Sequence, residues 1–333
     1  MTDAWLFIAL AIVSALVVRM MIAVRLMDHP DPRKLHRQPI PKGGGVGIVV
    51  AFMLGVVLLP IGPPPGVILG AAAVALVSFA DDLWDWPFTA KLATQVFAAA
   101  LVVGSGLYVQ QFHLPWLGSL DLGPWGMLVT GLWLVFATNA MNFMDGMNGL
   151  AAGTALVASA FLALIAAGQG GWFAYSAAML LAAGLIGFLP FNFPGARIFM
   201  GDVGSQFCGF MLAVLGVAAA RFEAVDMSFL IVPMLLSGLL WDVAFTLVRR
   251  ALAGENLARA HRGHLYQRAQ HSGLDASAVA MLHWGFTALG GLAAIGFIAA
   301  PNAAKPIFPL ALLLPQIWWT IYVLRRAPPL TEP

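Results

Sequence analysis

The chain alternates between long apolar stretches and short polar connections along its whole length. Eleven of the apolar stretches approach or reach the roughly 17 to 25 residues with which a helix crosses a bilayer. They cover residues 4–25, 45–61, 66–80, 91–108, 126–141, 150–167, 172–190, 204–220, 228–248, 279–300 and 306–324. The pattern therefore predicts an all-α, polytopic integral membrane protein with about eleven transmembrane helices.

Composition supports this class of protein. Hydrophobic residues fill 61% of the 333 positions and charged residues only 10%, whereas an average soluble domain has roughly 25% charged residues. Because no soluble domain, linker or repeat interrupts the pattern, we expect a single membrane domain over residues 1–333. Thr2 and Asp3 stand where a cleaved signal would carry a basic region, so the first helix is expected to remain in the mature protein.

The basic residues predict how the chain crosses the membrane. Loops rich in Lys and Arg stay in the cytoplasm, and an outside N-terminus leaves only Arg221 and Lys305 of the 17 basic residues outside. The chain has no basic tract of the kind that binds nucleic acid.

Most polar side chains that could do chemistry then fall in the cytoplasmic connections. These connections cover about 28–45, 81–91, 139–149, 190–204 and 249–278. Functional residues are commonly carried by loops on a rigid scaffold. We therefore expect the active surface to face the cytoplasm.

Two adjacent carboxylates, Asp81 and Asp82, begin the connection after the third predicted helix. Neighbouring carboxylates repel each other but offer the hard oxygen ligands that Mg²⁺ prefers, together with substrate phosphates. The alternative is that they only solvate the end of a membrane helix.

A second polar group is the segment NAMNFMDGMNG, in which Asn139, Asn142, Asp145 and Asn148 follow one another at intervals of three. On a helical end this spacing places the amides and the carboxylate along one face. Such groups bind a metal or a nucleotide, and the glycines allow a substrate to approach closely. A capped helix junction is the alternative, and it accounts for one polar residue better than for four.

Asp202 lies in FMGDVGSQF, immediately before the eighth predicted helix. Taken alone, Asp202 is a typical N-cap, while a helix N-terminus flanked by glycines is also a phosphate site. Because Asp81, Asp82 and Asp145 are predicted on the same side of the membrane, a metal shared with Asp202 is the favoured interpretation.

The last large connection contains His261, Arg262 and His264. Arg and His side chains suit a diphosphate, although retention of positive charge in the cytoplasm explains the arginines equally well. Asp242 lies within an apolar helix, where a carboxylate is costly and commonly functional. It either pairs with a nearby Arg or holds a nucleotide or sugar group, and the sequence leaves both open.

Five stretches together carry a family resemblance. In order they are RKLHRQPIPKGGGVGI, FADDLWDWPFTAKLATQ, NAMNFMDGMNGLAAG, RIFMGDVGSQFCGF and HRGHLYQR, and they extend from residue 33 to residue 268. The set resembles the polyprenyl-phosphate N-acetylhexosamine-1-phosphate transferases, which include the phospho-N-acetylmuramoyl-pentapeptide transferases. Five motifs in the family's order are far more specific than any one of them.

The resemblance implies a bacterial inner-membrane enzyme that transfers a sugar 1-phosphate from a UDP-N-acetylhexosamine to undecaprenyl phosphate on the cytoplasmic face and releases UMP. It implies Mg²⁺ as cofactor, with Mn²⁺ as a substitute. Asp202 would ligate the metal directly, with Asp81 and Asp82 at the same centre. It also implies that Asn142 and Asp145 line the binding site for the UDP-sugar. It further implies that substrate is bound by Lys42, Lys91 and His264.

Two departures from the family affect the expected donor. Asn148 stands where many relatives have a second carboxylate, and Tyr266 and Gln267 stand where relatives often carry histidines. The missing histidine run disfavours the muramoyl-pentapeptide substrate. It favours the branch that initiates O-antigen or other surface polysaccharides, with GlcNAc or a 6-deoxy relative as the sugar.

Two other functions remain to be weighed. An intramembrane Mg²⁺-dependent prenyltransferase would use the DDxxD spacing of DDLWD, but MDGMNG supplies only one carboxylate for the second motif that such enzymes need. A transporter would place its ionisable residues near the bilayer midplane, and only Asp242 fits that description. The sequence leaves the polyprenol length and the oligomeric state open, a homodimer included.

Overall fold

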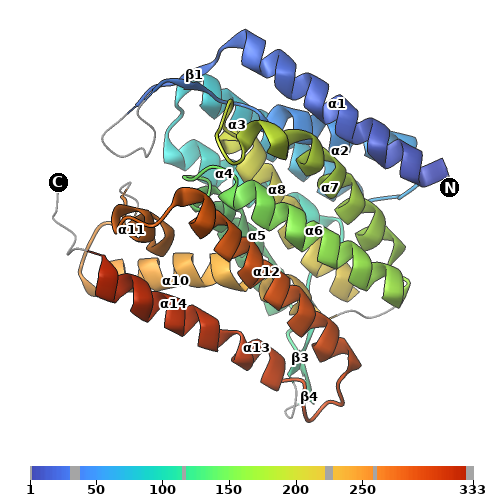
Figure 1. Cartoon of the computed structure of the whole chain (residues 1–333). Coiled ribbons are helices and arrows are strands. Elements are labelled where there is room, and N and C mark those ends of the chain that lie inside the picture. Colours follow the sequence, from blue (N-terminus) through green and yellow to red (C-terminus); the bar gives the residue numbers. More distant parts are fainter. Residues whose placement is uncertain (1, 31–37, 115–117, 222–227, 258–260, 328–333) are drawn as a thin grey trace.

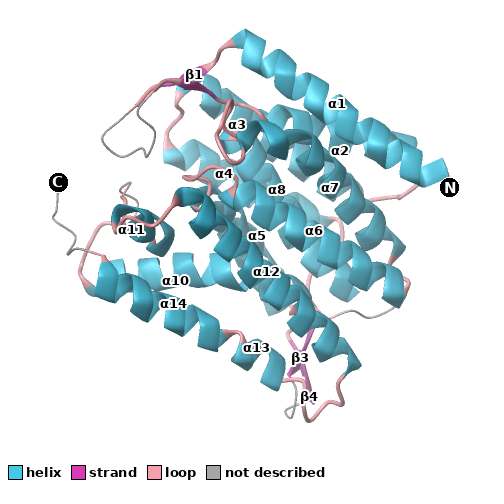
Figure 2. Ribbon diagram, in the orientation of Figure 1, coloured by secondary structure: helices cyan, strands magenta, loops and turns pink. Residues whose placement is uncertain are grey.

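The computed structural model describes all residues except 1, 31–37, 115–117, 222–227, 258–260 and 328–333. The described chain is a bundle of helices with two short antiparallel hairpins (Figures 1 and 2). In chain order the elements are α1 (Thr2–Val24), β1 (Met27–Asp28), β2 (Ile40–Pro41), α2 (Gly45–Leu58), α3 (Pro65–Trp84), α4 (Phe88–Gly104), β3 (Gln111–Leu114), β4 (Gly118–Asp121), α5 (Trp125–Phe143), α6 (Leu150–Gln169), α7 (Trp172–Asn192), α8 (Gly201–Arg221), α9 (Ile231–Leu235), α10 (Ser237–Leu252), α11 (Leu265–His271), α12 (Ala276–Ala299), α13 (Ile307–Ala311) and α14 (Leu313–Arg326).

The predicted fold class is confirmed, but the predicted count of eleven crossing helices is not. Each predicted apolar range contains a helix, yet within the described residues only eight helices are long and apolar enough to cross a membrane. α2 and α4 are apolar but shorter. The predicted ninth range is divided into α9 and α10, and α10 carries charged residues on its polar face.

The predicted eleventh range is interrupted between α13 and α14. Pro315 has no backbone N–H to donate to the carbonyl of Ala311, the residue at which α13 ends. Ile307–Arg326 still has the length and hydropathy of one span. The sequence also did not predict α11, a short helix inside the last polar connection.

α8 lies at the centre of the bundle. It packs against α2, α3, α5, α6 and α7, and 94% of its most apolar 18-residue window is buried. The corresponding buried share is only 28% for α1 and for the α13–α14 span. A helix that is apolar on all sides is typical of a buried position, so α8 is surrounded by protein while α1 and α14 present apolar side chains outward.

Glycines bring the start of α2 against the segment that leads into α8. A Cβ on Gly45 would lie 2.2 Å from the Cα of Gly204, so only glycine allows this approach. The N–H groups of Gly44 and Gly45 donate to the carbonyls of Phe199 and Met200 at 2.9 and 2.8 Å. The glycine run after Lys42 therefore docks directly onto the segment that contains Asp202.

The two ends of the bundle differ. β1, α11 and the end of α14 lie at one end in Figure 1, whereas the start of α1 and the β3–β4 hairpin lie at the other. The polar residues singled out from the sequence lie at the end that carries β1 and α11, on helix termini and connections that hydrogen bonds join to one another.

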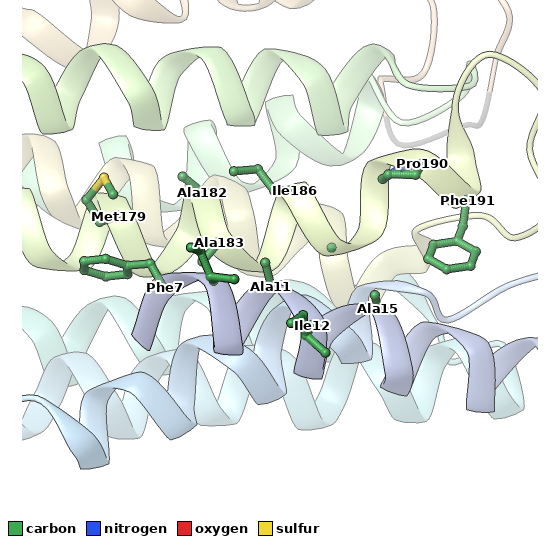
Figure 3. A pocket seen from close by; sticks show the side chains of 12 residues that line it. Phe7, Ala11, Ile12, Ala15, Met179, Ala182, Ala183, Ile186, Pro190 and Phe191 are labelled. Atoms are coloured by element: carbon green, nitrogen blue, oxygen red, sulfur yellow. The ribbon is translucent and has the colours of Figure 1, made fainter. Parts of the chain in front are cut away.

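A groove of about 520 Å³ runs between α1 and α7 (Figure 3). Phe7, Ile12, Met179, Ile186 and Phe191 form its walls, and small residues form its floor. All side chains that line it are apolar, so this groove offers nothing to bind a phosphate and is not the candidate active site.

Candidate active site

The centre of the site is an ammonium group between two carboxylates. Lys91 Nζ, on the first turn of α4, lies 2.8 Å from Asp81 Oδ2 at the end of α3 and 3.0 Å from Asp202 Oδ2 at the start of α8. The end of α3 and the start of α4, which are consecutive in the chain, therefore meet the start of α8, which lies 111 residues after Lys91. The side chains of Lys91, Asp81 and Asp202 are 20%, 10% and 25% exposed, which leaves a way in for a small polar ligand.

Asp82 has different partners from its neighbour Asp81. Its Oδ1 and Oδ2 accept hydrogen bonds from the backbone N–H groups of Asp202 and Val203, both at 3.1 Å. These are N–H groups of the first turn of α8, which have no acceptor within that helix. Asp82 thus caps α8 across 120 residues of sequence and brings Asp202 to Asp81 and Lys91. Its predicted roles in catalysis and metal binding remain predictions.

Gly201 makes this cap sterically feasible. Its φ of +75° is a conformation that L-residues rarely adopt, and a Cβ there would lie 2.6 Å from Asp82 Oδ2. We expect Gly201→Ala to cost about 1–3 kcal/mol of stability through backbone strain, plus a weakened cap, and to lower the melting temperature of the purified protein.

Gly131→Ala is the matched control for Gly201→Ala. Gly131 lies in the interior of α5, and a Cβ there would meet nothing within 4 Å. Alanine is favoured over glycine in a helix by about 1 kcal/mol, so this control should melt at or above the wild-type temperature. Equal melting temperatures for Gly201→Ala and the wild type would contradict the cap.

Amide side chains surround the charged centre. Gln206 Nε2 donates to Asp202 Oδ2 at 3.1 Å, and Gln206 Oε1 accepts from Gln95 Nε2 at 2.9 Å. Gln95 also exchanges hydrogen bonds with Asn139. Asn142 Nδ2 lies 3.5 Å from Asp202 Oδ2, and Asn142 Oδ1 accepts from Ser205 Oγ at 2.8 Å. The network holds the Asp202 carboxylate in one orientation.

Gln95, Gln206 and Ser205 were not among the predicted site residues. A usable signal was present, because Gln95 follows Lys91 by four residues and Gln206 follows Asp202 by four. Residues four apart lie on the same face of a helix. A polar side chain one turn into an apolar helix from a candidate residue thus marks the same site.

Asp145 lies in the turn between α5 and α6, where its backbone N–H donates to the Asn142 carbonyl at 3.1 Å. Burial, together with the nearby carboxylates of Asp202 and Asp82, raises the pKa of Asp145 well above its ordinary value. This side chain therefore has carboxylate neighbours, as the sequence predicted, although its role stays a prediction. Asn148 lies further along the turn and donates from Nδ2 to the Pro194 carbonyl at 3.3 Å.

Lys42 and Asp85 form an ion pair at the edge of the site. Lys42 Nζ lies 3.7 Å from Asp85 Oδ1, and the Asp85 side chain is 93% exposed. Asp85 ends α3 in a left-handed conformation, with φ at +49°. Its carboxylate therefore does not join Asp81 and Asp202, and the DDxxD spacing of the prenyltransferase alternative does not produce a carboxylate cluster.

Asp242 and His264 lie together beside the site. The Asp242 side chain is 1% exposed, and its Oδ1 lies 3.0 Å from His264 Nδ1. Oδ1 and Oδ2 also accept the N–H groups of Leu265 and Tyr266, both at 2.9 Å. Asp242 thus pairs with a histidine and with backbone, which neither alternative from the sequence had named. It is enclosed by protein rather than lining a pathway, which removes the main support for a transporter.

His261 stacks on His264 with their ring centroids 4.9 Å apart. Burial, with His264 and two arginines as further causes, lowers the pKa of His261 to about 4. The His261 Nδ1 accepts the Gly263 N–H at 3.0 Å, so the proton of the neutral ring is on Nε2. At neutral pH His261 can therefore donate a hydrogen bond to a phosphate but does not add a positive charge.

Arg262 follows His261 in the connection before α11. Burial lowers the pKa of His271, and the nearby Arg262 guanidinium lowers it further. Arg249 supports the same connection by donating from Nη2 to the Gly263 carbonyl at 3.2 Å. Residues 33–37 of the first quoted motif, and residues 258–260, lie outside the described residues.

The carboxylates at this site suit the way in which proteins commonly bind Mg²⁺. In the described part of the chain, no group of three or more His, Cys, Asp or Glu side chains is arranged to hold a metal ion by itself. Mg²⁺ does not need such a cage, because it is commonly bound through one or two carboxylates together with waters and substrate phosphates. Asp81 and Asp202, which already share one cation in Lys91, fit that mode of binding.

Comparison with known proteins shows what this sequence is similar to. The model for glycosyl transferase family 4 matches residues 64–220, just under half of the chain, and these include Asp81, Asp82, Lys91, Asp145 and Asp202. The chain is similar to this family over those residues. The resemblance to polyprenyl-phosphate N-acetylhexosamine-1-phosphate transferases noted in the sequence is thereby confirmed.

Proteins similar to this chain bear names of one kind. A probable undecaprenyl-phosphate N-acetylglucosaminyl 1-phosphate transferase of Bacillus subtilis is 29% identical, over 79% of this chain and 75% of its own length. A decaprenyl-phosphate N-acetylglucosaminephosphotransferase of Mycolicibacterium smegmatis is also 29% identical, over 92% of this chain and 84% of its own length. An undecaprenyl-phosphate alpha-N-acetylglucosaminyl 1-phosphate transferase of Thermotoga maritima is 26% identical, over 73% of both chains.

Proposed function

We propose that the chain transfers N-acetylhexosamine 1-phosphate from a UDP-sugar to undecaprenyl phosphate. The products are UMP and a lipid-linked diphosphate sugar. The observation that carries this proposal is the Lys91 ammonium held between Asp81 and Asp202 where three membrane helices end. This is a charged, partly exposed site at the end of an apolar bundle, which is where a soluble nucleotide sugar can meet a lipid phosphate.

The reaction needs little covalent chemistry from the protein. An oxygen of the lipid phosphate attacks the sugar-bearing phosphorus, and the bond from that phosphorus to the bridging oxygen breaks, so that UMP leaves with the bonding electrons. Catalysis of phosphoryl transfer rests mainly on positioning and charge neutralisation. Lys91 is placed to neutralise phosphate charge, and the amide network keeps Asp202 in position.

Asp81 and Asp202 would hold Mg²⁺, which would neutralise the diphosphate and polarise the bond to the leaving group. Direct attack by the lipid phosphate is the mechanism we favour over a covalent phosphoryl-enzyme. Lys91 pairs with both Asp81 and Asp202 within 3.0 Å, which makes these carboxylates poorer nucleophiles. The acceptor phosphate is itself largely ionised near neutral pH and needs no strong base.

The proposal also covers the identity of the donor sugar, the membrane in which the protein lies and the use of the lipid-linked product. The relatives' names favour GlcNAc as the sugar, while a 6-deoxy relative remains the alternative that the sequence raised. The lipid-linked product would initiate a surface polysaccharide such as O-antigen. The site would face the cytoplasm across the bacterial inner membrane with the N-terminus outside, because the basic residues concentrate at the end of the bundle that carries the site.

The test is UMP release by the purified protein with undecaprenyl phosphate and Mg²⁺, with UDP-GlcNAc, UDP-QuiNAc and UDP-FucNAc supplied in turn. Release that requires both the lipid and one particular donor is the expected result. Folded protein that releases no UMP from any of these donors, but transfers a labelled prenyl group to an aromatic acceptor, would overturn the proposal.

Lys91→Met should lower kcat by about 10²-fold, because one preorganised electrostatic group contributes about that much to catalysis. The substitution also leaves Asp81 and Asp202 without their shared cation. The Mg²⁺ concentration for half-maximal activity should therefore fall relative to the wild type.

Lys305→Met is the matched control for Lys91→Met, since Lys305 lies over the Phe297 ring away from the site. It should leave both kcat and the Mg²⁺ dependence unchanged. A Lys91→Met enzyme with wild-type kcat would refute the assigned role of Lys91.

A further inference from the structure

A buried carboxylate organises the connection before α12. Asp242, on α10, accepts hydrogen bonds from the N–H groups of Leu265 and Tyr266 and pairs with His264. Thr246 Oγ1 lies 3.3 Å from the same carboxylate as a weaker fourth contact. Both oxygens of a side chain that is 1% exposed are thus used to hold a segment 22 to 24 residues away in sequence.

α11 depends on such support. It has seven residues, and isolated helices shorter than about 12–15 residues are marginal in water. Its first N–H groups have no acceptor within the helix. Asp242 supplies acceptors for two of them, and Gln267 Oε1 accepts the N–H of His264 at 3.4 Å. Asp242 of α10 therefore anchors the N-terminus of α11, which also packs against α12 and α14.

Tyr266 connects α11 to the turn that carries Asp145. Its hydroxyl donates to the Phe143 carbonyl at 3.1 Å, across 123 residues of sequence. A Cβ on Gly146 would lie 2.2 Å from the same hydroxyl oxygen, so the ring lies directly against this turn. Tyr266 is 1% exposed, which leaves it no room to move without moving the turn.

We propose that Asp242 is a positioning residue for the UDP-sugar side of the site. Through the N-terminus of α11 and the Tyr266 hydroxyl it holds residues 143–148 in place, and with them Asp145. The inference rests on the proposed function. It gives Asp242 no contact with substrate.

A carboxylate is required at this position because both oxygens accept hydrogen bonds. The Asp242→Asn substitution keeps nearly the same side-chain volume. The new amide nitrogen would face a backbone N–H and cannot accept a hydrogen bond from it, so that N–H would lose its acceptor. Removal of its acceptor leaves a buried donor unpaired, which weakens the connection. Tyr266→Phe removes only the hydroxyl at the far end of the same connection. Thr246→Val is the matched control, because it removes only the long contact to Asp242.

The kinetic experiment compares these variants with the wild type in the UMP-release assay. Asp242→Asn and Tyr266→Phe should each raise the KM for the UDP-sugar about tenfold and leave the KM for undecaprenyl phosphate within about twofold. The double variant should be no worse than the poorer single variant, because residues that act through one connection are not additive. Thr246→Val should stay within about twofold of the wild type.

Hydrogen–deuterium exchange provides a readout that does not depend on catalysis. Amides in residues 143–149 should exchange about tenfold faster in both variants, because local opening depends on the contacts that hold a segment. Exchange in α6 and α7 should not change. Unchanged exchange at 143–149, multiplicative effects in the double variant, or equal increases in both KM values would each overturn the proposal.

The two proposals fail in different ways. If the wild type releases no UMP from any donor, the proposed function fails, while the exchange experiment still tests the connection from Asp242 to the turn. If Asp242→Asn does not fold, Tyr266→Phe alone decides the outcome through the exchange rate at 143–149 and the KM for the donor.

Discussion

Asp202→Asn is expected to lower kcat for UMP release by at least about 10³-fold, the upper range for loss of one preorganised electrostatic group. The substitution keeps the size of the side chain but removes the negative charge beside Lys91 Nζ, 3.0 Å away. It also places an amide where Asn142 and Gln206 now donate to a carboxylate oxygen. The variant would lose a proposed metal ligand and the orientation of the site together.

The measurement is single-turnover UMP release by wild type and variant at matched concentrations of folded protein. Asp121→Asn is the control, because Asp121 lies on the β4 strand at the opposite end of the bundle and accepts from the Gly123 N–H at 2.9 Å. That variant should retain full activity. Wild-type kcat and unchanged Mg²⁺ dependence in Asp202→Asn would remove Asp202 from the proposed mechanism.

Removal of divalent cations should abolish activity almost completely, with a loss of about 10³-fold that Mg²⁺ restores. The expected magnitude follows from the several kcal/mol that a bound cation contributes to phosphoryl transfer. Lys91 supplies only one positive charge for two carboxylates and an incoming diphosphate. Mn²⁺ should also restore activity, because both ions accept carboxylate, phosphate and water oxygens.

Ca²⁺ is the discriminating control for this experiment. It takes 6–8 oxygen ligands at longer distances, and Asp81 and Asp202 supply few of them, so it should restore little activity. The melting temperature should barely change on chelation, because the cap of Asp82 on α8 involves no metal. Full activity in excess EDTA would contradict a divalent cation at this site.

Much of the fold follows from the sequence alone. Long apolar stretches can bury their backbone polar groups in lipid only as helices or closed barrels, so an all-α membrane protein was predictable from residue pattern and composition. Each of the eleven predicted ranges contains a helix. Asp81, Asn142 and Asp202 were also identified, because polar side chains at the ends of apolar segments stand out by residue type. Lys91 was identified only through the family resemblance.

The count of crossing helices was not predictable in the same way. A hydropathy pattern reports the average environment of a segment, and the interruptions after Leu235 and Ala311 change that average little. α10 contains Asp242, Arg249 and Arg250 on one side. Only tertiary packing showed that this side faces the connection before α11.

The sequence by itself determined which residue types reach the site, and the tertiary structure decided what each of them does. Asp81 and Asp82 are equivalent in the sequence, yet one faces Lys91 and the other caps α8. Asp242 was expected to meet an arginine or a substrate, and it caps α11 instead. The physical reason is that a capping carboxylate and the N–H groups it accepts can be far apart in sequence, 120 residues for Asp82, so no local pattern records the pairing.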